Sequence, residues 1–211
     1  MRVTEHGPSV TPAAPAPGEA RPAGVGRPTD ESGPPTRSEG QTDEEEDDMT
    51  STQAAGTFRV SRTVAAPIGA VWRAWTDPAL VRAWWGPDGW SCPRADVRFA
   101  EGASSVVTMR GPDGTEISSL WSYRLIRPQE RIEFDSRFCD ADGTPVSPAA
   151  AGLPPAVPDV VPHVVTLAPQ GDSRTLLVVE ESGYQPGPVL EMSRQGQEQC
   201  LDKLVAAVEG S

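Results

Sequence analysis

The apolar residues of this chain change their spacing along the sequence, and that change limits the possible folds. From Ser91 to Glu181 they recur at every second position, which is the periodicity of β-strands. From Val189 to Val208 they recur at three- and four-residue intervals, as in a long amphipathic helix, and no other segment has the pattern of a long helix. A sheet with one apolar face and a single long helix can bury both apolar surfaces against each other.

The period-two region predicts strands separated by short turns. Strands are expected at about 57–64, 93–99, 104–110, 116–126, 131–138, 162–168 and 174–181. Turns such as Pro112-Asp113-Gly114 and Gly171-Asp172 suit hairpins, so successive strands should form an antiparallel meander. The proline-rich segment 139–161 is the exception, and we expect it to be a long, mobile surface loop.

Two short helices are predicted between the first two strands. Pro67 suits the first turn of one helix, and Asp77-Pro78 is an N-cap and N1 pair that starts the second. The sequence therefore predicts an α+β fold in which a curved antiparallel sheet grips a long C-terminal helix, with two short helices after the first strand. A sheet closed over one helix tends to leave a space between them, and ligand cavities form in such spaces.

The first 53 residues differ in composition from the rest. They contain no Phe, Trp or Tyr, eight of the 23 prolines, and four Arg against eleven Asp and Glu. Such a segment cannot bury enough apolar surface to fold, so we expect a disordered, acidic, Pro-rich tail followed by one domain over 54–211. Two explanations of residues 1–48 remain open: a genuine extension, or a misassigned start with translation beginning at Met49.

Charge and motif content exclude several classes of function. Neither part of the chain has the basic surplus that nucleic acids or anionic membrane surfaces require. There is no run of eighteen apolar residues and no secretory signal pattern, so a cytoplasmic protein without membrane insertion is expected. The three cysteines are far apart and no nucleotide, metalloprotease or hydrolase motif occurs, so no metal and no cofactor is predicted.

Several motifs occur in an order typical of one superfamily. They are APIGAVWRAWTDP at 66–78, WWGP at 84–87, RPQERI at 127–132, ESGY at 181–184 and GQEQCLDKL at 196–204. In these stretches the chain resembles the SRPBCC (START-like, helix-grip, birch-pollen-allergen-like) superfamily. Within it, the chain is similar to the bacterial branch related to the C-terminal domain of the heat-shock-protein-90 ATPase activator. The resemblance covers nearly the whole domain and implies a helix-grip fold with a cavity.

Two positions depart from that family's pattern. Gly196 is followed by Gln197 where the family usually has an aromatic residue, and Trp121 stands where a glycine is common. An indole on the inward face of the sheet could fill much of the cavity, which makes Trp121 the residue that decides whether a pocket remains.

Cavity-lining candidates are apolar residues of the predicted interior and a few polar ones among them. They are Trp75, Trp84, Trp85, Trp121, Tyr123, Glu181, Gln197 and Leu201. If Leu177 and Val179 face inward, alternation places Glu181 on the same face, where it could orient a polar end of a ligand; alternatively the strand ends there and Glu181 reaches solvent or an arginine. The one histidine of the domain, His163, is interpreted as a partly exposed structural side chain.

Three functions are compatible with the sequence. The first is a non-catalytic protein that binds or sequesters a small apolar molecule in its cavity, favoured by the fold, the aromatic content and the lack of a catalytic set. The second is an enzyme of the polyketide cyclase or aromatase type that uses Glu181 and Tyr123. The third is a co-chaperone-like interaction domain with a protein partner, suggested only by the family resemblance.

Overall fold

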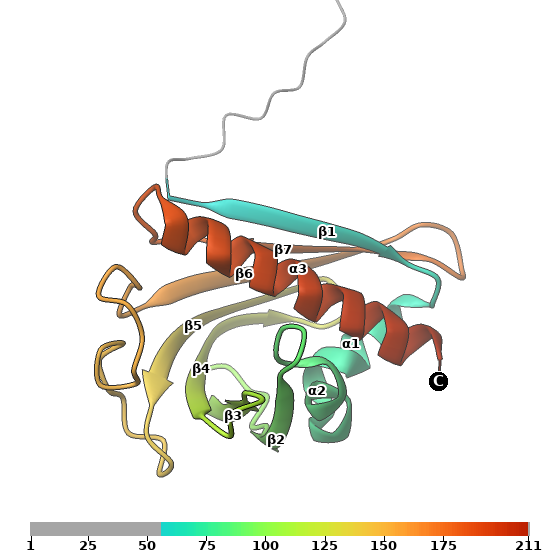
Figure 1. Ribbon diagram of the computed structural model, residues 1–211. Helices are drawn as coiled ribbons and strands as arrows, with labels where there is room; N and C mark the ends of the chain where they lie inside the picture. The colour runs from blue at the N-terminus through green and yellow to red at the C-terminus, as the bar shows by residue number, and fades with distance from the viewer. Residues whose placement is uncertain (1–55, 211) are drawn as a thin grey trace, which may run out of the picture. The chain divides into compact units, whose positions relative to one another are not determined.

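The computed structural model describes residues 56–210, so the predictions for the tail and for a start at Met49 lie outside the described residues. Its elements are β1 (Phe58–Val64), α1 (Ile68–Thr76), α2 (Pro78–Trp84), β2 (Ser91–Asp96), β3 (Ser104–Arg110), β4 (Glu116–Arg127), β5 (Arg131–Cys139), β6 (Val161–Pro169), β7 (Thr175–Glu181) and α3 (Pro188–Glu209). The predicted fold class is confirmed: a curved antiparallel sheet holds the long C-terminal helix (Figure 1).

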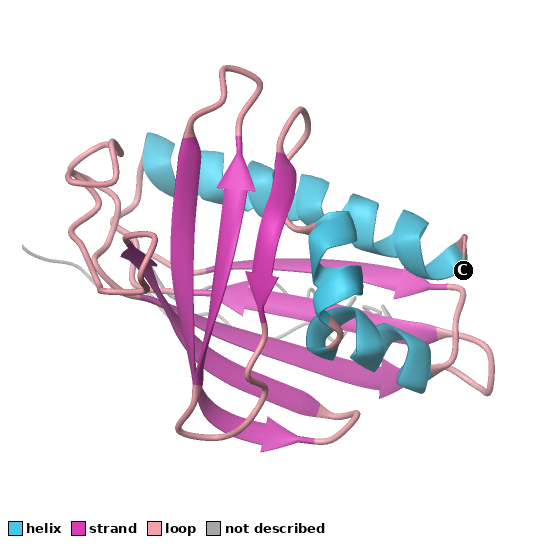
Figure 2. Cartoon of the chain, turned by 90° about the horizontal axis from the view of Figure 1, so that it is seen from below, coloured by secondary structure: helices cyan, strands magenta, loops and turns pink. Residues whose placement is uncertain are grey.

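The sheet has seven strands in the order β1-β7-β6-β5-β4-β3-β2. Every neighbouring pair is antiparallel, and β1 joins the meander by pairing with β7, the strand farthest from it in sequence. Helix α3 packs against β1, α1 and α2, and Figure 2 shows all three helices along the same side of the bent sheet. The apolar faces of sheet and helix therefore cover each other, as their two periodicities require.

The corner between the two short helices is fixed by local hydrogen bonds. The Asp77 carboxylate accepts the backbone N–H of Ala79 at 2.7 Å, which confirms the predicted N-cap. The indole N–H of Trp84 donates to the carbonyl of Ala74 at 2.8 Å across the corner. These contacts hold the end of α2, and with it Trp85, beside α3.

Strand β2 differs from its expected range of 93–99. It begins at Ser91 and ends at Asp96, so Phe99 lies beyond it and packs edge-on against Trp72. The backbone N–H of Arg98 donates to the Ser105 hydroxyl at 2.9 Å instead of to a backbone carbonyl. The side-chain acceptor thus ends the pairing at this edge of the sheet.

The connection between β5 and β6 has turns and one isolated bridge, between Cys139 and Pro145, but no helix or further strand. Strand β6 pairs with β5 only up to Ser136, so the last residues of β5, including Phe138, extend past the edge of β6. The sheet is therefore open at this end, on the side where α3 begins.

Candidate functional site

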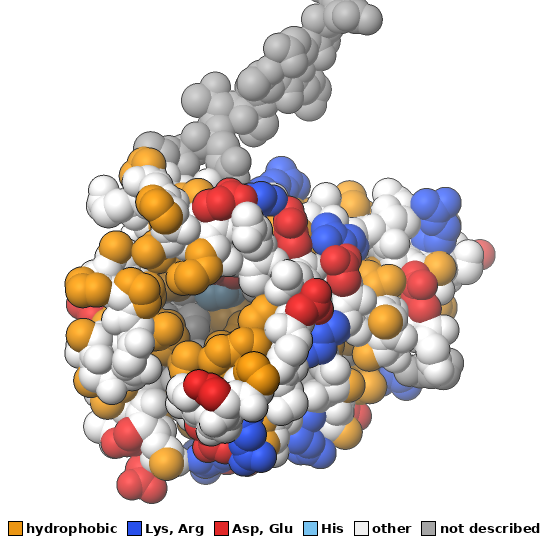
Figure 3. All heavy atoms as spheres, viewed as in Figure 1, with side chains coloured by type: hydrophobic (Ala, Val, Ile, Leu, Met, Phe, Trp, Pro, Cys, Tyr) orange, Lys and Arg blue, Asp and Glu red, His pale blue; other side chains and the backbone are white. Residues whose placement is uncertain are grey.

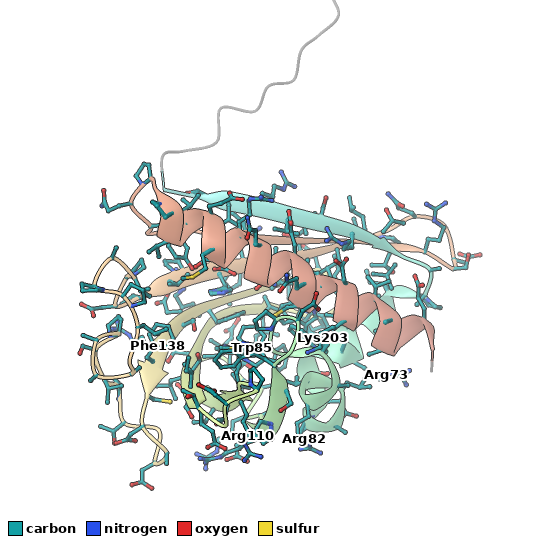
Figure 4. The ribbon with its side chains drawn as sticks, in the orientation of Figure 1. Arg73, Arg82, Trp85, Arg110, Phe138 and Lys203 are labelled. Atoms are coloured by element: carbon teal, nitrogen blue, oxygen red, sulfur yellow. The ribbon has the colours of Figure 1, made fainter. Side chains whose placement is uncertain are left out.

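A cavity of about 180 Å³ lies between the open end of the sheet and α3. Figure 3 shows the hollow with hydrophobic side chains at its rim and the histidine at its floor. The sheet contributes a wall of mixed character from β3, β4 and β5: Met109, Ser119, Ser136 and Phe138. In Figure 4, Phe138 lies on the β5 side of the space below α3 and Trp85 on the α2 side.

The opposite walls come from α3 and from the strands nearest to it. The helix contributes Ser193, Gly196, Gln197 and Cys200. The turn after α2 contributes Trp85 and Pro87, and the last two strands with the loop after β7 contribute Val161, His163, Glu181 and Tyr184. Side chains from both ends of the domain sequence therefore meet in one cavity.

Strand alternation explains why two ionisable side chains face this cavity together. In β6 the odd-numbered residues from Val161 to Leu167 are buried, and in β7 those from Thr175 to Glu181 are buried. The β6–β7 register pairs His163 directly with Glu181. The two side chains therefore project side by side from neighbouring strands.

His163, Glu181 and Tyr184 form a buried hydrogen-bonded chain. Nε2 of His163 lies 3.2 Å from Oε1 of Glu181, and both side chains are 6% exposed. The Tyr184 hydroxyl donates to Glu181 Oε2 at 2.8 Å, and Nδ1 of His163 lies 2.9 Å from the carbonyl oxygen of Val161. Because a carbonyl only accepts, Nδ1 carries a proton, and the contact between Nε2 and Oε1 requires one more proton shared by the pair.

The surroundings of this chain shift its acid–base equilibria. Burial lowers the pKa of His163, but the Glu181 carboxylate and the two hydrogen bonds raise it by more, and the net pKa lies above its usual 6.5. Burial and the neighbouring carboxylate raise the pKa of Tyr184 well above 10, so its hydroxyl stays protonated. Phe134 stacks on the imidazole with a centroid distance of 4.6 Å and closes it off from the opposite side.

Tyr184 is held in place by a close backbone contact with Gly56. Its N–H donates to the Gly56 carbonyl at 3.1 Å, and Gly56 has a φ of 81°. A Cβ at position 56 would lie 1.9 Å from the carbonyl oxygen of Tyr184, so only glycine fits. Gly56 thereby fixes the position of Tyr184 in the cavity wall.

Two cavity-lining side chains carry buried N–H groups without a hydrogen-bond partner. Nε2 of Gln197 and Nε1 of Trp85 have no acceptor in the described structure, although the residues are only 5% and 8% exposed. Gly196 lines the same cavity, and an added Cβ there would meet nothing within 4 Å. The cavity thus offers unused donors and unfilled space.

Of the eight predicted lining residues, the structure brings Trp85, Glu181 and Gln197 to the cavity. The others are buried in the core outside the lining: Trp75, Trp84, Trp121, Tyr123 and Leu201. The Tyr123 hydroxyl is bonded to Ser105 Oγ at 2.9 Å, and burial raises the pKa of Tyr123 to about 12. Among these five, Trp75 packs on Trp84 and Trp121, and Tyr123 packs on Phe134.

The Trp121 side chain occupies interior volume that would otherwise belong to the cavity. Its ring centroid lies 4.7 Å from that of Trp85 and 5.1 Å from that of Phe134, and it is 1% exposed. The indole fills the centre of the sheet and confines the cavity to the open end. A pocket nevertheless remains beside it.

His163 is the functional candidate that the sequence interpretation missed. It is 5% exposed, so its assignment as a partly exposed side chain was wrong, and Glu181 meets neither solvent nor an arginine. The signal available in the sequence was the alternation along the strand, which places His163 on the same face as Val165 and Leu167. The observed register is centred on Asp172, so His163 and Glu181 pair; equal steps from a two-residue turn at Gly171-Asp172 would have paired residue 163 with residue 180.

Cys200 lines the cavity but is a poor nucleophile. Burial raises the pKa of its thiol to about 12, so it stays protonated near neutral pH. Residues 56–210 contain no cluster of three or more His, Cys, Asp or Glu side chains that could hold a metal ion. None of their helices is long and apolar enough to cross a membrane.

The chain matches one protein-family model over most of its domain. The family model described as activator of Hsp90 ATPase homolog 1-like protein matches residues 65–209, well over half of the 211 residues. No curated protein matches the chain.

Solved structures resemble the domain over nearly their whole length. A protein of Chromobacterium violaceum is 26% identical, with 73% of this chain and 97% of that one covered and a TM-score of 0.60. A protein of Arthrobacter aurescens is 25% identical, with 74% and 88% covered and a TM-score of 0.62. The AHSA1 protein of Silicibacter pomeroyi, 18% identical with 71% and 95% covered and a TM-score of 0.57, shares the fold.

Proposed function

The chain belongs to the family of activator of Hsp90 ATPase homolog 1-like proteins, and from that premise we propose that it binds a small, mainly apolar molecule in the cavity beneath α3. The observation that carries the proposal is the cavity of about 180 Å³, which Gly196 lines without a side chain. Protein interiors are packed as densely as organic crystals, so a cavity that no side chain of the protein fills is an available binding site.

The size of the cavity limits the ligand. An engineered cavity of roughly 150 Å³ takes up benzene, and this cavity measures about 180 Å³. One aromatic ring with a short substituent fits that volume. The polar side of the ligand would meet the wall that holds Glu181, Gln197 and Tyr184.

The two alternative functions fit less well. A polyketide cyclase would have to hold several fused rings, and the two groups expected to act in it are apart, because Tyr123 bonds to Ser105 outside the lining that contains Glu181. A protein-interaction domain has no large exposed apolar patch in its favour, because within residues 56–210 the single exposed large hydrophobic side chain is Met192.

The test is to fill the cavity without unfolding the protein. Gly196→Leu places an isobutyl group in the open space, and Leu is more favourable than Gly inside a helix by about 0.8–1 kcal/mol. We expect fluorobenzene, followed by ¹⁹F NMR relaxation, to bind the wild-type protein and not this variant. Gln195→Leu adds the same side chain at an exposed neighbouring position of α3 and should leave binding intact. Absence of fluorobenzene binding to the wild type would refute the proposal.

A further inference from the structure

We infer that the ligand of this cavity is a neutral molecule with a hydrogen-bond acceptor of the carbonyl type, which the side-chain N–H groups of Gln197 and Trp85 bind. This inference rests on the proposed function and adds the chemical class of the ligand. It follows from which polar groups around the cavity are already paired and which are not.

The unpaired groups are donors. Nε2 of Gln197 and Nε1 of Trp85 line the same cavity, are buried with their residues at 5% and 8% exposure, and have no acceptor among the described residues. Native proteins leave few buried polar groups unsatisfied, because each lost hydrogen bond to water costs free energy that nothing replaces. A ligand oxygen that accepts from either group would remove the cost at that group.

The strongest acceptor of the cavity wall is already used. Glu181 accepts from the Tyr184 hydroxyl on Oε2 and faces His163 Nε2 with Oε1. A ligand that brings a donor to Glu181 therefore has to compete with an existing hydrogen-bonded chain, whereas a ligand that brings an acceptor to Gln197 Nε2 or Trp85 Nε1 meets a free donor.

The charge of the wall favours a neutral ligand. His163 and Glu181 share one proton beyond the one on Nδ1, so the pair has no net charge wherever that proton resides. Among the described residues, the lining contains neither Lys nor Arg. The cation on the next turn of α3, Lys203, already donates to the carbonyls of Gly86 and Trp90 at 2.7 and 3.1 Å. An ion would lose its hydration without gaining a counter-charge.

Four probes of one shape and different polarity test the inference. α-Methylstyrene, acetophenone, benzoate and benzamidine have the same skeleton, with respectively an apolar group, a neutral acceptor, an anion and a cation. We expect acetophenone to bind roughly five- to tenfold more tightly than α-methylstyrene. The net free energy of one hydrogen bond corresponds to about that ratio of dissociation constants. Benzoate and benzamidine should bind more weakly than both. Dissociation constants from calorimetry or ligand-observed NMR supply the comparison.

Three variants test whether the N–H groups of Gln197 and Trp85 cause the preference for acetophenone. Gln197→Met and Trp85→Phe each remove one unpaired N–H and put an apolar side chain in its place, so the ratio between acetophenone and α-methylstyrene should fall toward one while α-methylstyrene still binds. Trp75→Phe is the matched control, because Nε1 of Trp75 is equally buried and unpaired but lies outside the lining. It should leave the ratio unchanged.

The outcomes separate the two proposals. Equal binding of acetophenone and α-methylstyrene, or tightest binding of benzoate or benzamidine, overturns the ligand class and leaves the cavity as a binding site. A ratio that survives in both Gln197→Met and Trp85→Phe also overturns it. Binding of none of the four probes overturns the proposed function together with the inference.

Discussion

Nε2 of His163 lies 3.2 Å from Oε1 of Glu181 inside a wall where both side chains are 6% exposed. The two residues are adjacent on paired strands, so the sheet itself enforces the contact. Asp135 is the other carboxylate that raises the pKa of the histidine, by its charge. Removing the Glu181 charge therefore changes the titration of His163 directly.

Glu181→Gln should reverse the contribution of His163 to the pH dependence of stability. In the wild type the folded pKa is raised, so this contribution is fully present below about pH 6.5, the unfolded pKa, and is lost as the pH rises through the folded pKa. In the variant, burial dominates and lowers the folded pKa, so stability is lost as the pH falls through 6.5. Each unit of pKa difference corresponds to about 1.4 kcal/mol.

Urea unfolding between pH 5.5 and 8.5 measures this effect. Glu180→Gln is the control, because Glu180 is the exposed neighbour on the opposite face of β7 and loses the same charge. Relative to that control, Glu181→Gln should gain stability with rising pH. The same pH profile for both variants would show that the pair does not control the protonation of His163.

Gly56→Ala should destabilise the protein more than an ordinary glycine substitution at positive φ. The new Cβ would lie 1.9 Å from the Tyr184 carbonyl oxygen, so the backbone that fixes the tyrosine has to move. Gly114→Ala is the matched control, with a φ of 85° and nothing within 4 Å of the added Cβ. We expect a loss of about 1–2 kcal/mol for the control, from left-handed backbone alone, and a larger loss for Gly56→Ala in chemical denaturation. Equal losses would contradict the close contact.

Trp121→Leu should enlarge the cavity. The Trp121 indole packs on Trp85 and Phe134, and Trp85 lines the cavity, so a smaller side chain opens space next to the existing one. We expect naphthalene to bind the variant more tightly than the wild type, at a cost in stability of up to about 3–5 kcal/mol, as for large core truncations. Trp72→Leu, which removes an indole that packs on Phe99, is the control and should not improve naphthalene binding. Unchanged naphthalene affinity in Trp121→Leu would mean that the core collapses into the vacated space.

The cysteines should resist alkylation in the native protein. Cys92, Cys139 and Cys200 are all free and buried, and burial raises the pKa of each thiol, that of Cys200 to about 12. Because the thiolate is the reactive form, iodoacetamide at pH 8 should modify none of them within minutes and all three in urea. Mass spectrometry counts the adducts. Rapid native modification of Cys200 would show that the cavity wall opens to solvent.

Strand and helix positions could be predicted because they depend on local patterns. The Asp77 cap, the hairpin turns and the alternation along β6 and β7 each follow from a few neighbouring residues. Alternation also indicated that Glu181 faces inward, which it does. Alternation along β6 also places His163 on the inward face with Val165 and Leu167, but a histidine at the start of a strand after a proline gave no local sign of burial.

The sequence by itself determined the α+β class, the helix-grip arrangement and the inward direction of Glu181, because periodicity decides which side chains must leave water. The tertiary structure alone decided that Trp121 packs on Trp85 rather than lining a pocket, that Glu181 pairs with His163, and that Gln197 and Trp85 keep unpaired donors. The cavity of about 180 Å³ is what remains when the volume of the side chains is subtracted from the volume that the curved sheet encloses. Both volumes depend on packing across the whole domain, so the size of the cavity cannot be predicted from a local sequence pattern.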